Sequence, residues 1–159
     1  AKIRCILLEE RLTPMDQLDL FIVDRRIHVS TIIKPALERG MVVLCDRFSD
    51  STIAYQHYAG CLPRKVVLER DREARAGLKP DLVILLDMPI TESLARTKTR
   101  GVDLTVFEQE KLAFHDKVRN GFINIAIENY DNHAIVRASE SIEIVTETIW
   151  KFVKPLIMK

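Results

Sequence analysis

Residues 41–56 read MVVLCDRFSDSTIAYQ, an apolar run that passes directly into charged, hydroxylic and aromatic residues. The five apolar residues at 41–45 are typical of a strand covered on both faces, as in a parallel sheet. We therefore predict a buried strand that ends at Asp46 and Arg47. Ligands of open α/β sheets bind beyond the carboxyl ends of the strands, so both residues are site candidates. A carboxylate there can hold a metal ion or orient a nucleophile, and a guanidinium can bind phosphate through two hydrogen bonds.

The rest of the chain alternates between helical and strand patterns. Apolar runs predict further strands over residues 82–86 and 134–136. Caps, prolines and helical spacing predict the helices. One runs from Thr13-Pro14 to Gly40, with a kink or junction at Pro35. The others cover residues 2–9, 63–76, Pro89 to about residue 100, 107–128 and 141–158. This alternation predicts one α/β domain over residues 1–159, with a parallel sheet and helices on both faces.

Composition excludes several classes of partner. A net charge of +1 gives no overall field to attract nucleic acid or an anionic membrane surface. No apolar stretch approaches the ~20 residues that a membrane helix needs, and no signal peptide is visible. Three cysteines without a C-x-x-C pair indicate reduced thiols in a cytoplasmic protein. The four histidines do not lie at metal-ligand spacing.

Two segments resemble the signatures of one enzyme family. Residues 46–56 resemble the DR[YHF]-x-x-S-x-x-AYQ signature of the thymidylate kinases. The LFIVDR run at 20–25, His28 and the KPALERG run at 34–40 resemble the LF-x-x-DR…H…I-x-PAL-x-RG segment of the same family. The order and spacing of the two segments are compatible, and weaker likeness extends over most of the chain.

The resemblance implies a fold and a reaction. The fold would be the three-layer P-loop NTPase fold of the nucleoside monophosphate kinases. The reaction would transfer a phosphoryl group from ATP to dTMP, giving dTDP for dTTP biosynthesis, with Mg²⁺ as the metal. The resemblance also implies a homodimer, with an interface on the helices near Pro14–Arg39 and on the helix that begins at Pro63.

The resemblance assigns roles to the charged and aromatic candidates. Arg47 would bind the acceptor phosphate, and Asp46 would lie near Mg²⁺ and the reacting groups. Phe21 would stack on thymine, and Arg25 would donate to a thymine carbonyl, with Asp24 as a possible partner that holds the guanidinium. Without the resemblance, Phe21 reads as ordinary core, Arg25 as a solvated helix charge, and Asp46 with Arg47 as a surface ion pair.

Four further residues follow in the same signature. Ser51 and Thr52 would approach the base, or would simply cap the helix that follows. Tyr55 would pack against the sugar and disfavour a ribose 2′-hydroxyl. Gln56 can both donate and accept, as an imide edge requires, or it is ordinary loop polarity.

The region that would bind ATP is less complete. By resemblance, Arg96 and Arg100, with Lys98 between them, would belong to a lid over the ATP phosphates, at about residues 96–108. A solvated helix end is the alternative. The family often has an Arg in a DR-[IFY]-E element after the lid, and this chain has Val106 at that place.

The phosphate-binding motif G-x-x-x-x-G-K-[ST] does not occur in the 159 residues. We expect a truncated kinase rather than a protein that has lost ATP binding. Two alternatives stay open, namely another nucleotide or deoxynucleoside kinase of the same superfamily, and a non-catalytic dTMP-binding protein.

Overall fold

The computed structural model describes residues 3, 6, 12–99 and 110–158. The chain divides into two compact units, one made of residues 1–79 with 104–121 and the other of residues 80–103 with 122–159. The boundary falls inside helix α7 (Leu112–Glu128), which contributes its first part to one unit and its second part to the other.

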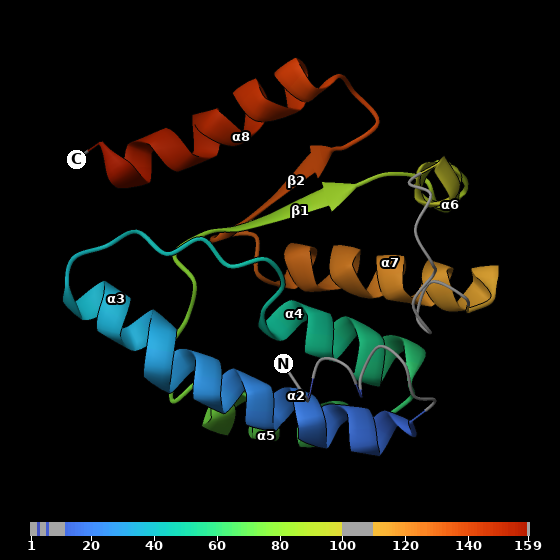
Figure 1. Cartoon of the computed structure of the whole chain (residues 1–159). Coiled ribbons are helices and arrows are strands. Elements are labelled where there is room, and N and C mark those ends of the chain that lie inside the picture. The colour runs from blue at the N-terminus through green and yellow to red at the C-terminus, as the bar shows by residue number, and fades with distance from the viewer. Residues whose placement is uncertain (1–2, 4–5, 7–11, 100–109, 159) are drawn as a thin grey trace. The chain divides into compact units, whose positions relative to one another are not determined.

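Most of the helix predicted over residues 2–9 lies outside the described residues. One long helical stretch of the first unit begins at Pro14 (Figure 1). It consists of α2 (Pro14–His28), the π-helical segment η1 (Val29–Ile33) and α3 (Lys34–Glu38). Thr13 caps it as predicted, because its hydroxyl accepts a hydrogen bond from the Asp16 amide at 3.2 Å. The predicted junction at Pro35 is also present, since the π-helical turn ends just before it. Gly40 follows the last turn with φ +73°, a conformation that glycine adopts without strain.

Two further helical stretches pack on α2. The first consists of α4 (Ser49–Thr52) and the π-helical segment η2 (Ile53–Ala59), and the second is α5 (Arg64–Ala74), which begins after Pro63 as predicted. Their buried apolar side chains form the core of this unit: Leu18, Ile22, Val29, Ile33, Ala36, Ile53, Ala54, Val67 and Ala74. The core thus fixes the ends of α2, α4 and α5 that carry the candidate site.

The second unit contains a small parallel sheet. Strand β1 (Val83–Asp87) pairs in register with β2 (His133–Arg137), and both predicted strands are confirmed to within one or two residues. Parallel strands need a crossover connection, which here includes α6 (Ile90–Thr99) and α7. The closing helix α8 (Ile142–Ile157) packs against β2. A helix-rich chain with a parallel sheet agrees with the predicted α/β class, while the three-layer arrangement stays a prediction.

The strand predicted at residues 41–45 is wrong. The segment is not assigned to any strand, and Val42 and Leu44 are 71% and 95% exposed. A run of apolar residues becomes a buried strand only if a neighbouring strand hydrogen-bonds to its edge. Among the residues that the structure describes, β1 pairs only with β2, and 41–45 lacks such a neighbour.

Candidate functional site

The residues predicted for the site lie on several elements of the first unit. Phe21 and Arg25 lie one turn apart on α2, and Asp46 and Arg47 lie in the loop before α4. Four further candidates follow in the next helical stretch, namely Ser51, Thr52, Tyr55 and Gln56. Hydrogen bonds join α2, the loop and α4 at one side chain, that of Arg25.

Arg25 holds the site together. Its Nη1 donates to Thr52 Oγ1 at 2.7 Å and to Asp71 Oδ1 at 2.6 Å, and its Nη2 donates to the Phe48 carbonyl at 2.7 Å. The guanidinium also lies 5.1 Å from the centroid of the Phe48 ring. The side chain is only 9% exposed, so Arg25 is not the solvated helix charge of the alternative interpretation.

Asp71 is the partner of Arg25 that sequence reasoning missed. Asp24, the candidate that the sequence offers for this role, is exposed on α2. Asp71 comes instead from α5, where its side chain is 3% exposed and also accepts a bond from Arg75 Nε at 3.1 Å. The sequence did contain a signal, because Asp71 shares a helical face with the buried Val67 and Ala74. A carboxylate in such a stripe is almost never buried without a partner.

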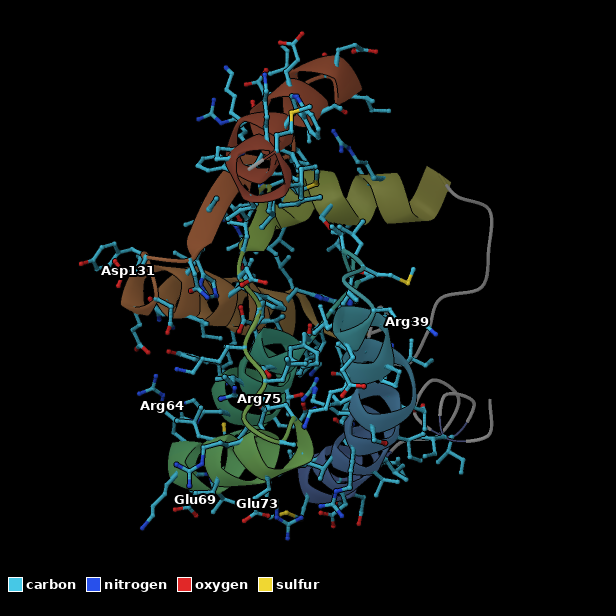
Figure 2. The ribbon with its side chains drawn as sticks, turned by 90° about the vertical axis from the view of Figure 1, so that its left-hand side faces the viewer. Arg39, Arg64, Glu69, Glu73, Arg75 and Asp131 are labelled. Carbon is cyan, nitrogen blue, oxygen red and sulfur yellow. The ribbon has the colours of Figure 1, made fainter. Side chains whose placement is uncertain are left out.

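Arg75 extends the network to the end of α5. Its Nη1 donates to the Leu78 carbonyl at 2.5 Å, beyond the helix. In Figure 2, Glu69 and Glu73 of the same helix point away from the neighbouring helices, and Arg75 lies on the inner side. Asp71 therefore sits between two guanidinium groups, and the cluster of three side chains carries a net charge of about +1.

Burial and charge act on Arg25 in opposite directions. Desolvation lowers the pKa of Arg25 from its usual value, and the Asp71 carboxylate, which is also its hydrogen-bond partner, raises it. An arginine side chain keeps its proton in proteins, so the group at the centre of the site is a cation that only donates hydrogen bonds.

Arg47 lies where the chain turns into α4. Its φ is +63°, in the left-handed region that residues with a β-carbon rarely adopt. Its guanidinium is 5.4 Å from the centroid of the Tyr55 ring, and that ring makes an edge contact with Phe114 at 6.1 Å. Strained residues of this kind cluster at binding and catalytic sites, so the conformation of Arg47 agrees with a functional role.

Cys45 and Asp46 lie beside these cations. Burial raises the pKa of the Cys45 thiol, the charge of Arg25 opposes that shift, and the charge of Asp46 adds to it. The Cys45 Sγ also contacts the Arg47 carbonyl at 3.4 Å. Asp46 itself is exposed, so its carboxylate is accessible.

Gln56 lies deeper than the other candidates. It is fully buried, and its Nε2 donates to Gln17 Oε1 at 3.1 Å. Its Oε1 is buried and lacks a hydrogen-bond partner among the described residues. Gln56 is therefore not ordinary loop polarity. While the bond to Gln17 persists, a ligand could engage its carbonyl oxygen or the second hydrogen of Nε2.

The predicted lid is only partly described. Arg96 lies on α6 in the second unit, where its Nη1 donates to the Ala138 carbonyl at 3.0 Å. Arg100 and most of the region 96–108 lie outside the described residues. Among the described residues, three or more His, Cys, Asp or Glu side chains nowhere gather as a metal cluster. The described helices also include none with the length and apolar content to cross a membrane.

Comparisons with known proteins agree with the two sequence signatures. The chain matches the family model described as thymidylate kinase over residues 1–149. It is 40% identical over 153 residues to the thymidylate kinase of Desulfovibrio desulfuricans, covering 91% of this chain and 70% of that protein. It is 39% identical to that of Syntrophotalea carbinolica, with coverage of 94% and 73%. It is 36% identical to that of Solidesulfovibrio magneticus, with coverage of 98% and 78%.

Proposed function

Because this chain belongs to the thymidylate kinase family, a family of phosphotransferases, we propose that it phosphorylates dTMP with ATP as the donor. An oxygen of the dTMP phosphate forms a bond to the γ-phosphorus of ATP, the bond to the ADP oxygen breaks, and dTDP and ADP leave. Such transfer needs positioning and electrostatic stabilisation more than covalent help. The observation that carries the proposal is the family match over residues 1–149, which includes both signature segments.

The base would bind beside Arg25. Three of its five N–H groups are engaged, because Nη1 uses both hydrogens and Nη2 uses one. The other two can donate to a pyrimidine carbonyl. Phe21, half-buried one turn earlier on α2, would offer its ring to the base. Thr52 and Ser51 would complete the surface that contacts the base.

The phosphate would bind at Arg47. This residue is exposed and presents its guanidinium over the Tyr55 ring. An arginine can bind phosphate oxygens through two parallel bonds. Tyr55 would then lie between base and phosphate, against the sugar.

Asp46 is the candidate magnesium ligand. Mg²⁺ prefers oxygen ligands and is commonly held by one or two carboxylates together with substrate phosphates. The exposed Asp46 carboxylate next to Arg47 fits that requirement without a larger cluster of protein ligands. When bound, the ion would neutralise charge on the phosphates. Arg96 and Arg100 remain our candidates for contacts with ATP, and Arg96 would have to exchange the Ala138 carbonyl for a phosphate oxygen.

A substrate screen tests the proposal. Purified protein is assayed with ATP and Mg²⁺ against dTMP, dUMP, dCMP and free deoxynucleosides, and binding of each is measured in parallel. We expect strong preference for dTMP in both measurements. A preference for dCMP or for a nucleoside would instead favour another kinase of the superfamily. If the intact polypeptide binds dTMP tightly but does not catalyse phosphoryl transfer from ATP, the result would favour a non-catalytic dTMP-binding protein.

We also propose that the protein forms a homodimer through α2 and α5. Val23 and Ile27 lie four residues apart on α2, so they share a face, and both are about half exposed. Leu68, on α5, is exposed as well. A stripe of this kind is what a dimer of two antiparallel or crossed helix pairs would cover. The family resemblance of the segment supports the same assignment.

A further inference from the structure

The carboxylate of Asp71 is placed to control the direction of the Arg25 guanidinium. Asp71 Oδ1 accepts one Nη1 hydrogen at 2.6 Å, and Thr52 Oγ1 accepts the other at 2.7 Å. The Phe48 carbonyl takes a hydrogen of Nη2 at 2.7 Å. A planar guanidinium held at three points on two nitrogens cannot rotate, so its two remaining N–H groups have fixed directions.

Asp71 is itself fixed. Its second oxygen accepts from Arg75 Nε at 3.1 Å, and Arg75 is tied to the Leu78 carbonyl at 2.5 Å. The side chain is 3% exposed, so water does not compete for these bonds. The carboxylate is thus an anchor that belongs to α5, while the guanidinium that it holds belongs to α2.

Stability alone does not account for this arrangement. Buried ion pairs are often no more stabilising than apolar side chains of similar volume, because both charges must be desolvated. Here two guanidinium groups share one carboxylate, which leaves about one positive charge in excess beside the candidate site. Such an excess is useful where a partly negative oxygen of a ligand binds.

We propose that Asp71 is a positioning residue that sets the specificity for the base, by holding Arg25 so that it donates to a pyrimidine carbonyl and rejects an amino group. This inference rests on the proposed function. Thymine carries a carbonyl oxygen at the ring position where cytosine carries an amino group. Arginine only donates, so a fixed guanidinium opposite an amino group leaves donors facing donors. A guanidinium that could swing aside would avoid that conflict and tolerate both bases.

The test compares binding of dTMP and dCMP to the wild-type chain and to Asp71→Asn by calorimetry. The measured quantity is the ratio of the dCMP and dTMP dissociation constants. Because hydrogen bonds to charged groups contribute strongly, we expect this ratio to fall about 10-fold or more in Asp71→Asn. A general loosening of the fold would weaken the binding of dTMP and dCMP equally and leave the ratio of their dissociation constants unchanged.

Asp19→Asn is the matched control. Asp19 forms an ion pair with Arg70, so it joins the same two helices, α2 and α5, and about half of its side chain is exposed. Removing it deletes a carboxylate and a helix–helix ion pair without touching Arg25. For Asp19→Asn we expect the ratio of the dCMP and dTMP dissociation constants to stay within about 2-fold of the wild-type value, because exposed ion pairs contribute little to stability.

A second variant covers the case in which Asp71→Asn does not fold. Arg75→Gln leaves Asp71 and Arg25 in place and removes one anchor of the carboxylate, so the ratio should fall in the same direction by a smaller factor. An unchanged ratio in a folded Asp71→Asn, or in Arg75→Gln if only that variant folds, would overturn the inference and leave the proposed function intact. A wild-type chain that binds neither nucleotide would overturn both.

Discussion

At the scale of single residues, Arg25 of α2 depends on a partner from another helix, because the Asp71 carboxylate of α5 accepts one of its hydrogens at 2.6 Å. The signature placed Arg25 and Thr52 at the site, and the structure joins them by a 2.7 Å hydrogen bond. Asp71 lies 46 residues further along the chain from Arg25, and no local pattern pairs residues over such a distance. Residue type and spacing reveal which side chains can do chemistry, whereas the partners that orient them depend on how helices pack.

The backbone at Arg47 gives a prediction that separates function from stability. Arg47→Ala should lower turnover about 10²–10³-fold, the usual effect of removing a group that stabilises developing charge. Arg47→Gly should lose as much activity. Its free energy of unfolding should nevertheless be about 1 kcal/mol higher than that of Arg47→Ala, because only glycine adopts φ +63° without strain. Steady-state kinetics and urea titrations measure the two effects. Arg72→Ala, exposed on α5, is the control, and near-normal turnover of Arg47→Ala would refute the role in phosphate binding.

The thiol of Cys45 reports on the charges around it. Burial raises its pKa, the charge of Arg25 opposes that shift and the Asp46 carboxylate adds to it, and the net result is a raised pKa. In a Cys5→Ser, Cys61→Ser background, the pH midpoint of alkylation by iodoacetamide should lie above the value of about 8.5 for a free thiol. Asp46→Asn should move that midpoint down, since it removes a negative charge that disfavours the thiolate. A midpoint that does not respond would show that Asp46 is remote from Cys45.

At the scale of elements, a strand prediction is confirmed where a neighbouring strand pairs with the segment. It is wrong where the described residues offer the segment no such neighbour. The runs at 82–86 and 134–136 became β1 and β2, which pair with each other. The run at 41–45 is just as apolar, but it does not form a strand and Leu44 is almost fully exposed. Apolar composition shows that a segment favours burial, and only the three-dimensional neighbourhood decides whether burial occurs.

Helix α7 approaches η2 through a glycine, which reverses the usual effect of an alanine substitution. A β-carbon at Gly121 would lie 2.9 Å from three side-chain atoms of Tyr58. Glycine to alanine normally stabilises the interior of a helix by up to ~1 kcal/mol. Here we expect Gly121→Ala to destabilise the protein by about 1–3 kcal/mol, the usual cost of overpacking. Thermal melts compare it with Asn120→Ala, an exposed neighbour on the same helix, and a higher melting temperature for Gly121→Ala would contradict the close contact.

At the scale of the whole molecule, the chain belongs to the thymidylate kinase family, and its homodimer is a proposal. The sequence predicted one domain, and the described residues group into two compact units whose boundary lies inside α7. Helix alternation could not predict such a division, because it depends on the density of contacts between distant segments. The single domain and the lid at 96–108 therefore stay predictions.

The proposed dimer can be tested through its apolar stripe. Ile27→Lys would place a charge on a half-exposed side chain of α2, and desolvating that charge in an interface is costly. We expect light scattering to give twice the chain mass of 18.3 kDa for the wild type and a single chain mass for the variant. Ile144→Lys alters an equally exposed residue on α8 and should leave the dimer intact. A monomeric wild type would refute the interface.

The π-helical segment η2 gives the candidate site an unusual tolerance to changes in chain length. A π turn holds one residue more than an α turn, so deleting one residue between Ile53 and Ala59 could restore ordinary α-helical bonding without leaving a gap. The same deletion in α5 would rotate every later side chain by about 100° and expose Asp71. Gene variants that lack one codon in η2 should therefore still fold, with Tyr55 or Gln56 facing a new direction. The helix would still form after the loss of one residue, but the ligand specificity of the site would change.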